Sequence, residues 1–399
     1  MKDVWKHSLE LREAIKIENF LDLGVFGINN KVMLMFGEGN LNDGFPSIQA
    51  QVFTENGQLS AQCSGQLPPS SELLALYRDW QLMYKASLGI KRKLEGKPAQ
   101  LTNFSRLDLD RLTKKLEQHL NKWLISEQFI PIDRILHGKF NHSNQLQVII
   151  QSLNPDVRRL PWHLWNFLDP YKKAEIALSS PFYDRALKTD VTRKVRNSFA
   201  ISGPRNRIRI LSILGDAQGI DINTDRQLLA KIDAETTFLV KRNRQELNER
   251  LYSEQGWEIL CFSGHSSSEM DGSNGYIKIN DTDKLTIPEF KNALSTAIER
   301  GLQIAIFNSC DGLGLANQLA QLHIPQIIVF REPVPDVVAQ EFLKNFLTAF
   351  ASGKSFYLAV REAREKLQIL ETHFPCASWL PVICQNPAEV PPTWRSLQH

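Results

Sequence analysis

The sequence predicts an α/β protein whose mostly parallel sheet is flanked by helices. From about Arg207 onward, short apolar segments typical of strands alternate with longer segments that have apolar residues at helical spacing. Such alternation is typical of strand–helix–strand units whose strands run parallel. Segments such as RIRILSIL (207–214) and LQIAIFN (302–308) are apolar at most positions, as expected for strands buried on both faces.

Each element of this half of the chain follows from its local pattern. The expected strands are RIRILSILGD (207–216), TTFLVKR (236–242), WEILCFSGH (257–265), LQIAIFNSC (302–310), PQIIVF (325–330) and SWLPVIC (378–384), with YIKIN (276–280) as a short excursion. The expected helices are TDRQLLAKI (224–232), RQELNERLYS (244–253), LTIPEFKNALSTAIERG (285–301), GLANQLAQL (314–322), DVVAQEFLKNFLTAFASG (336–353) and SFYLAVREAREKLQIL (355–370).

The texture of the chain changes near residue 104. Residues 1–104 are expected to form a smaller accessory module with β-strands and a helix, and residues 105–399 a larger domain whose core spans about 205–387. Within the first part we expect an amphipathic stretch from Val4 to Leu23, then strands KVMLMFGEG (31–39), SIQAQVFT (47–54) and QLSAQCSG (58–65), then a helix over 70–87. The larger domain is expected to begin with a helix over 106–126 and a strand over 145–152.

Composition excludes several classes of protein. The 47 basic and 44 acidic residues give a net charge of +3, which argues against a nucleic-acid or membrane-surface partner. The five cysteines are scattered and no pair has C-x-x-C spacing, so we expect reduced thiols, no metal and no cofactor. No secretory signal and no apolar run long enough to cross a bilayer is visible, so the expected location is the cytoplasm.

Reactive residues follow two of the predicted strands. His265 follows EILCFSG, and Cys310 follows IAIFNS. In open α/β sheets, ligands bind beyond the carboxyl ends of the strands, and neighbouring strands lie about 4.8 Å apart. A thiol and an imidazole at adjacent strand ends can meet in one cleft, where the imidazole takes the thiol proton and creates a nucleophilic thiolate. Cys310 also precedes an expected helix, whose N-terminus favours the thiolate and whose Gly312 and Gly314 would admit a substrate backbone.

Each of these residues alone is more often structural. A cysteine at the end of a buried strand is commonly a small core residue, and a histidine at a strand end is commonly a loop residue. The pair, flanked by Ser and Gly, favours function. Cys261, inside the same strand as His265, is expected to be buried and inert, and Trp162, His163 and Trp165 to serve packing.

These residues resemble the CHAT family of caspase-like proteins, of the type common in cyanobacteria. The likeness rests on FSGHSSS (262–268) and FNSCDGLGLA (307–316), with His265 preceding Cys310 by 310 − 265 = 45 residues. Supporting segments are RRLPWHLWNF (158–167), ILGDAQGIDI (213–222) and SWLPVICQNP (378–387), so the likeness spans about 105–390.

The resemblance implies a caspase–hemoglobinase fold and a His–Cys dyad that needs no metal. His265 would be the general base and Cys310 the nucleophile, with the backbone N–H groups of Ser266 and Cys310 as the oxyanion hole. Many relatives have Gly where this chain has Ser266. Relatives that cut after Arg or Lys often carry Asp two residues before the cysteine, where this chain has Asn308.

Two other carboxylates are candidates for the first specificity pocket. Asp216 and Asp311 each follow a strand that ends near the expected cleft, and Asn308 is grouped with them as a substrate-binding residue. The alternative for each carboxylate is a turn or helix-cap role. The loop REPVPD (331–336) follows another strand and is expected to flank the cleft.

The sequence therefore predicts a cysteine endopeptidase that cleaves a protein or peptide substrate. The resemblance implies a role in bacterial signalling, defence or programmed death, with activation by a protein partner. One alternative is a non-catalytic interaction module of the same fold. Another is a nucleotide-binding α/β protein, which the absence of a glycine-rich phosphate loop disfavours.

Overall fold

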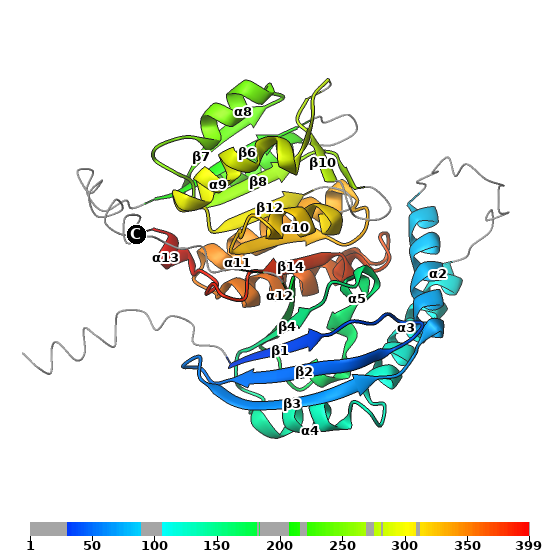
Figure 1. Ribbon diagram of the computed structural model, residues 1–399. Coiled ribbons are helices and arrows are strands. Elements are labelled where there is room, and N and C mark those ends of the chain that lie inside the picture. Colours follow the sequence, from blue (N-terminus) through cyan, green and yellow to red (C-terminus); the bar gives the residue numbers. More distant parts are fainter. Residues whose placement is uncertain are drawn as a thin grey trace, which may run out of the picture.

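One large sheet runs through the molecule, with helices on both of its faces (Figure 1). The computed structural model describes residues 30–88, 106–181, 183, 207–215, 222–268, 275–280, 282–308 and 312–398. The amphipathic stretch expected from Val4 to Leu23 lies outside these residues.

The large sheet has 11 strands in the order β3-β2-β1-β4-β5-β14-β13-β12-β8-β6-β7. In chain order these are β1 (Asn30–Phe36), β2 (Phe45–Phe53), β3 (Leu59–Leu67), β4 (Leu146–Gln151), β5 (Ala174–Ser179), β6 (Ile208–Leu214), β7 (Ala234–Val240), β8 (Ile259–Ser263), β12 (Ile304–Asn308), β13 (Gln326–Phe330) and β14 (Pro381–Gln385). A second sheet holds β9 (Ser266–Ser268), β10 (Gly275–Lys278) and β11 (Lys284–Thr286).

Neighbouring strands of the large sheet are parallel except at β3–β2, β2–β1 and β13–β14. The predicted mostly parallel α/β sheet is thus confirmed. Because β13, β12, β8, β6 and β7 all run the same way, their carboxyl ends meet at one edge. His265 and Asn308 lie at that edge, where β8 and β12 end.

Helices from the described segments cover both faces of the sheet (Figure 1). The α-helices are α2 (Ser71–Ser87), α3 (Arg106–Leu124), α4 (Ile130–Lys139), α5 (Pro155–Arg159), α7 (Ile222–Ala230), α8 (Arg244–Leu251), α9 (Lys291–Glu299), α10 (Gly312–Ala320), α11 (Asp336–Ala351), α12 (Phe356–Lys366) and α13 (Trp394–Leu397). Short 3-10 turns are η1 (Trp162–Leu164), η2 (Asn166–Leu168), η3 (Ile287–Phe290), η4 (Leu367–Leu370) and η5 (Ala377–Trp379).

The segment 285–301 differs from the single helix that its pattern predicts. It begins as strand β11 and turns through η3 before α9 starts at Lys291. Thr286 and Glu289 form a reciprocal capping box, with the Thr286 N–H donating to Glu289 Oε2 at 2.7 Å. The cap and Pro288 set the start of the turn here, because the N–H groups of a first turn need an acceptor outside the helix.

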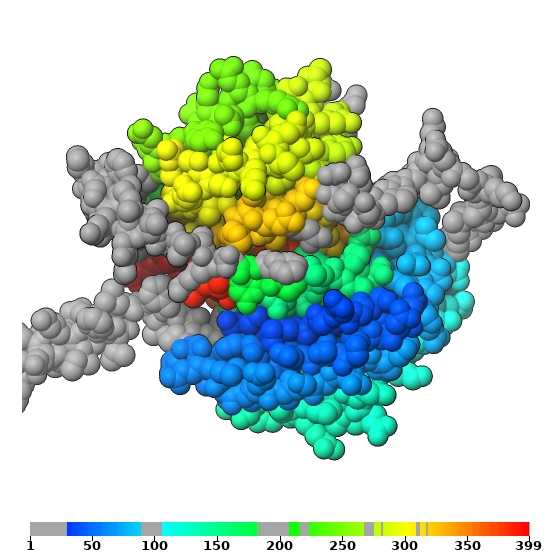
Figure 2. Space-filling view, in the orientation of Figure 1, coloured from blue at the N-terminus to red at the C-terminus, as the bar shows by residue number. Residues whose placement is uncertain are grey.

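The N-terminal strands do not form a sheet of their own. β1 pairs in parallel with β4 and in antiparallel with β2, so β1–β3 extend the same sheet. Figure 2 shows the blue surface of these strands lying directly against the green surface of the next segment. The division near residue 104 stays a prediction, and residues 89–105 lie outside the described chain.

Helix α2 joins the N-terminal segment to the rest of the core. Trp80 is fully buried and stacks on Trp379 at 5.3 Å between ring centroids, and its Nε1–H donates to Cys376 Sγ at 3.4 Å. The Tyr84 hydroxyl donates to the Pro333 carbonyl at 2.6 Å. Aromatic burial of this kind contributes both area and directed contacts. Helix α2 is therefore fastened to the loop that follows β13.

Among the residues that the structure describes, no helix is both long enough and apolar enough to cross a bilayer.

Candidate functional site

Strands β8 and β12 lie side by side, and each precedes one of the two predicted reactive residues in the sequence. They pair in parallel with Ser263 level with Asn308. His265 follows Ser263 by two residues, and Cys310 follows Asn308 by two residues. His265 and Cys310 therefore each follow, by two residues, one member of the cross-strand pair Ser263–Asn308.

His265 leaves β8 through a glycine turn. Gly264 has φ of 157°, a conformation that residues with a side chain rarely adopt, and its N–H points toward the Asn308 carbonyl at 3.5 Å. The His265 carbonyl accepts a hydrogen bond from the Lys278 N–H at 2.9 Å. The imidazole is half-buried. The backbone of His265 is thus fixed to β10 on one side and follows β8 on the other.

Ser266 starts β9 and lies opposite Ile277 of β10. In an antiparallel ladder, directly opposite pairs alternate between hydrogen-bonded and non-hydrogen-bonded. Since Lys278 donates to His265, the Ser266–Ile277 pair is of the second kind, and the Ser266 N–H is directed away from β10. In this orientation the Ser266 N–H can donate a hydrogen bond to a group outside the β9–β10–β11 sheet.

Three of the predicted site residues, Asp216, Cys310 and Asp311, lie outside the described residues. The chain resumes at Gly312, the first residue of α10. A Cβ atom added to Gly312 would lie 2.5 Å from Val329 Cβ and 3.2 Å from the Phe330 nitrogen. The missing side chain of Gly312 thus lets α10 pack against β13, and the expectation that Gly312 admits a substrate backbone stays a prediction.

Asn308 and a residue that the sequence did not single out come together beneath this edge. Asn308 Nδ2 lies 3.4 Å from Asp225 Oδ2, and Asp225, in the first turn of α7, is 1% exposed. Three further buried oxygens, Ser212 Oγ, Ser263 Oγ and Asn308 Oδ1, have no hydrogen-bond partner among the described residues. Buried polar atoms usually have a hydrogen-bond partner, so three buried oxygens without one on neighbouring strands are unusual.

Weak signals for these additional residues exist in the sequence. Ser212 interrupts an otherwise apolar run, and Ser263 precedes His265 by two. Asp225 looks like an ordinary first-turn helix carboxylate, because the pattern does not show that its helix face meets β12. The packing of α7 is the information that the sequence lacks.

The described thiols are poor nucleophiles. Burial, followed by the Asp225 carboxylate, raises the pKa of Cys261 far above its ordinary value, so its predicted inertness agrees with the structure. Burial likewise raises the pKa of Cys384, and it raises the pKa of Cys376 to about 11. Burial also raises the pKa of Cys63, which is half-buried on β3.

The aromatic segment after α5 is part of the core, as predicted. Trp162 is 1% and Trp165 is 2% exposed, and their rings meet edge to face at 6.4 Å. Burial, then the nearby Arg364 and Arg331, holds the pKa of His163 well below its usual value. Within the described part of the chain, no three His, Cys, Asp or Glu side chains come together as metal ligands.

Two comparisons with known proteins found a match. The family model of the CHAT domain matches residues 111–386. Among solved structures, the chain is similar to the Arg-specific cysteine proteinase gingipain R, with 12% identity and a TM-score of 0.41 over 67% of this chain and 69% of that one. No curated protein matches.

Proposed function

We propose that this chain, which belongs to the CHAT domain family, is a cysteine endopeptidase with Cys310 as nucleophile and His265 as acid–base partner. The observation that carries the proposal is the parallel pairing of β8 with β12 at Ser263 and Asn308. Two residues further along each strand is a reactive side chain. Strand spacing of about 4.8 Å then brings a thiol within reach of an imidazole at the sheet edge.

The chemistry requires each of these groups in a defined order. His265 takes the proton of the Cys310 thiol, and the thiolate attacks the peptide carbonyl carbon to form a C–S bond. The N–H groups of Ser266 and Cys310 stabilise the oxyanion, and the imidazolium then gives its proton to the leaving amine as the C–N bond breaks. Water, with its proton taken by His265, hydrolyses the thioester and regenerates the thiol. The direction of the Ser266 N–H, away from β10, supports its part in this scheme.

The properties of the four described cysteines support Cys310, and none of the others, as the nucleophile. Cys261, Cys376 and Cys384 are buried and protonated at neutral pH, because burial raises the pKa of each. Cys63 lies on β3, at the opposite end of the strand order from β8 and β12. None of the four is placed to react with a peptide at the edge where His265 lies.

A protein substrate and an activating protein partner belong to the same proposal, within bacterial signalling, defence or programmed death. Support for a partner-operated switch comes from α2, which precedes the matched family region and holds the 331–336 loop next to β12. A partner that moved α2 would move that loop.

The test is covalent labelling with a peptide that carries an electrophile at its C-terminal end. The full chain is treated at pH 7.5, and the modified residue is found by peptide mapping. We expect one adduct, on Cys310, and suppression by more than about 100-fold in His265→Ala, since removing a general base typically costs 10²–10⁴.

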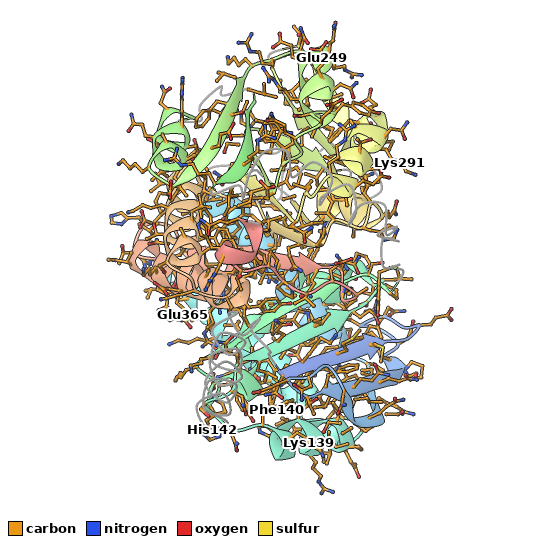
Figure 3. All side chains as sticks on the ribbon, turned by 90° about the vertical axis from the view of Figure 1, so that its left-hand side faces the viewer. Lys139, Phe140, His142, Glu249, Lys291 and Glu365 are labelled. Carbon is orange, nitrogen blue, oxygen red and sulfur yellow. The ribbon has the colours of Figure 1, made fainter. Side chains whose placement is uncertain are left out.

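Two variants serve as controls. His142→Ala removes an exposed histidine at the end of the molecule far from Glu249 and Lys291 (Figure 3) and should label like wild type. Cys63→Ala removes a half-buried thiol and should leave the adduct unchanged. Equal labelling of wild type and His265→Ala would instead indicate an ordinary thiol on a non-catalytic CHAT module.

A further inference from the structure

We propose that the buried guanidinium of Arg158 is the centre of an anion-binding site, and that the site takes a small monovalent anion of about the size of chloride. Three observations carry the inference: a buried positive charge without compensation, a buried donor without a partner, and a cavity beside them. The site lies away from the edge where β8 and β12 end, so the inference does not depend on the proposed peptidase function.

Arg158 lies in α5 and reaches the carboxyl ends of two parallel strands. Its Nη1 donates to the carbonyl of Ser179, the last residue of β5, at 2.8 Å and to the carbonyl of Ser152, just after β4, at 3.4 Å. Strand β14 runs parallel to β5 and antiparallel to β13. The ends of β4, β5 and β14 therefore lie at the edge where β13 begins, opposite to the His265 edge.

The charge of Arg158 is buried without a carboxylate to compensate it. The residue is 4% exposed, and within the described chain it forms no ion pair. Burial lowers the pKa of Arg158, and its neighbour Cys384 supplies no negative charge, because burial raises the pKa of that thiol. Removing an ion from water is strongly unfavourable, so buried charges are normally paired.

Two other buried arginines show the usual arrangement. Arg331, also 4% exposed, donates to backbone carbonyls as Arg158 does, but it has the Glu332 carboxylate as a neighbour. Arg209 is 7% exposed, and its Nε lies 3.8 Å from Glu235 Oε2. Backbone carbonyls accompany a carboxylate in the first case and do not replace it. Arg158 has the carbonyls without the carboxylate.

Part of the Arg158 guanidinium is left to donate to a ligand. Both of its hydrogen bonds come from Nη1, and its buried Nε has no partner among the described residues. A guanidinium has five N–H donors, and its Nε–Nη2 edge is a common binding edge for anions. A buried donor without an acceptor is rare, and here it belongs to a group that also lacks a counter-charge. One bound anion would supply both.

A cavity beside Arg158 provides the space. Its volume is about 10 Å³, which is enough for one group of roughly the size of a water molecule. Hydroxyl and amide side chains in its wall can donate hydrogen bonds, and apolar side chains keep the remaining wall dry. The polar side chains are Ser180, Tyr183 and Asn386, and the apolar ones include Leu178 and Ile324.

The charge and size of the site select its ligand. A metal cation would be repelled by the guanidinium. Sulfate and phosphate are too large for a cavity of this volume, and their second charge would be buried without compensation. A water molecule could accept the Nε–H bond but would leave the positive charge unpaired. A halide-sized monovalent anion satisfies both requirements.

The first test is thermal unfolding of the full chain, dialysed into sodium gluconate and titrated with sodium chloride at a constant ionic strength of about 0.2 M. Gluconate is too large for the cavity. We expect chloride to raise the melting temperature of wild type saturably, by about 2–3 °C. Arg158→Met should lose this chloride dependence. Arg111→Met removes a guanidinium that is 76% exposed and should keep it.

Two results of this titration would overturn the inference. One is a melting temperature of wild type that is the same in chloride and gluconate. The other is a chloride effect of equal size in wild type and Arg158→Met, which indicates a general effect of the salt. Neither result bears on the proposed peptidase function, which is tested by labelling of Cys310.

A second measurement covers the case in which Arg158→Met does not fold. Crystals of the wild-type chain are grown in sodium bromide, and the anomalous scattering of bromide locates the bound ions. We expect an anomalous peak in the cavity, next to Arg158 Nε. Bromide at surface positions alone, an adventitious ion only, would overturn the inference. A water molecule in the cavity without anomalous signal would overturn it too.

Discussion

Two buried acidic clusters at the same edge of the sheet are built in opposite ways. Glu332, after β13, is 2% exposed and receives the Tyr77 hydroxyl at 3.0 Å, the Lys85 ammonium at 2.9 Å and the Gln81 amide. The cluster around Asp225 and Asn308 instead contains buried oxygens without partners in the described chain. The first cluster is complete within the protein, which is typical of a structural joint. In the second, these oxygens have no donor within the described chain.

The structural joint has a simple geometric origin. Tyr77, Gln81 and Lys85 are spaced four residues apart on α2 and so form one stripe facing the carboxylate. Glu332, together with burial, raises the pKa of Tyr77, with burial the larger cause. The joint ties the N-terminal helix to the loop beside the proposed active-site strands.

Among these predictions, the largest change in the free energy of unfolding is expected for a substitution of Glu332. Glu332→Ala leaves three buried or half-buried donors without an acceptor and should lower the free energy of unfolding by about 3–5 kcal/mol. Urea denaturation at pH 7.5 measures this. Glu365→Ala, which loses only a surface pair with Arg361 at 47% side-chain exposure, should cost less than about 1 kcal/mol. Similar losses in both variants would break the distinction between the clusters.

The packing between α10 and β13 predicts the next effect. Gly312→Ala forces a Cβ to within 2.5 Å of Val329 Cβ, and overpacking of this kind costs about 1–3 kcal/mol. Because Gly312 follows Cys310 by two residues, peptide cleavage should fall as well. Gly138→Ala in α4 meets nothing within 4 Å and should gain about 0.5–1 kcal/mol. Chemical denaturation and kcat/KM, measured on the same samples, separate the two effects.

Titration offers a third way to sharpen the contrast. His163 packs against Trp379, with ring centroids 5.6 Å apart. Burial holds its pKa in the folded protein well below the ordinary value of 6.5. Below pH 6.5 the unfolded chain takes up a proton that the folded chain refuses, so stability present above that pH is lost as pH falls. The free energy of unfolding should therefore decrease as the pH is lowered from 7.5 to 5.0. His163→Gln should abolish that part of the pH dependence in urea denaturation.

The smallest effect is expected where polar atoms lack partners. Ser212→Ala removes a buried hydroxyl that donates to nothing described and should change the free energy of unfolding by less than about 0.5 kcal/mol. Ser378→Ala breaks a 2.6 Å bond to the Glu371 carboxylate and should cost about 1.5–3 kcal/mol. Equal costs would show that the Ser212 hydroxyl is bonded in solution, and the contrast between the clusters would weaken.

Much of the fold was predictable because its strands are apolar and its helices amphipathic. The strands β6, β8, β12 and β13 were found by their continuous apolar runs. Strand β5 and helix α4 were missed, since AEIALS (174–179) is short and lies in a segment without a regular alternation. Membership of β1–β3 in the large sheet was also missed, because strand pairing across 100 residues leaves no local pattern.

Part of the candidate site could likewise be predicted from the sequence, and part could not. The adjacency of the His265 and Cys310 strands could be argued from the sequence, because both end in reactive residues and parallel strands end together. Asp225 could not be identified, because its contact with Asn308 depends on which face of α7 meets β12. The roles of His265, Ser266, Asn308 and Cys310 stay predictions until they are measured.

The most direct measurement is the rate at which iodoacetamide alkylates Cys310 between pH 6 and pH 9, followed by mass spectrometry. An isolated thiol has a pKa of about 8.5, so its rate should fall by more than about 100-fold from pH 8.5 to pH 6. A thiol paired with His265 should keep its rate within about threefold over that range, and His265→Ala should restore the steep decline. The same steep profile in wild type and variant would contradict the pairing of thiol and imidazole.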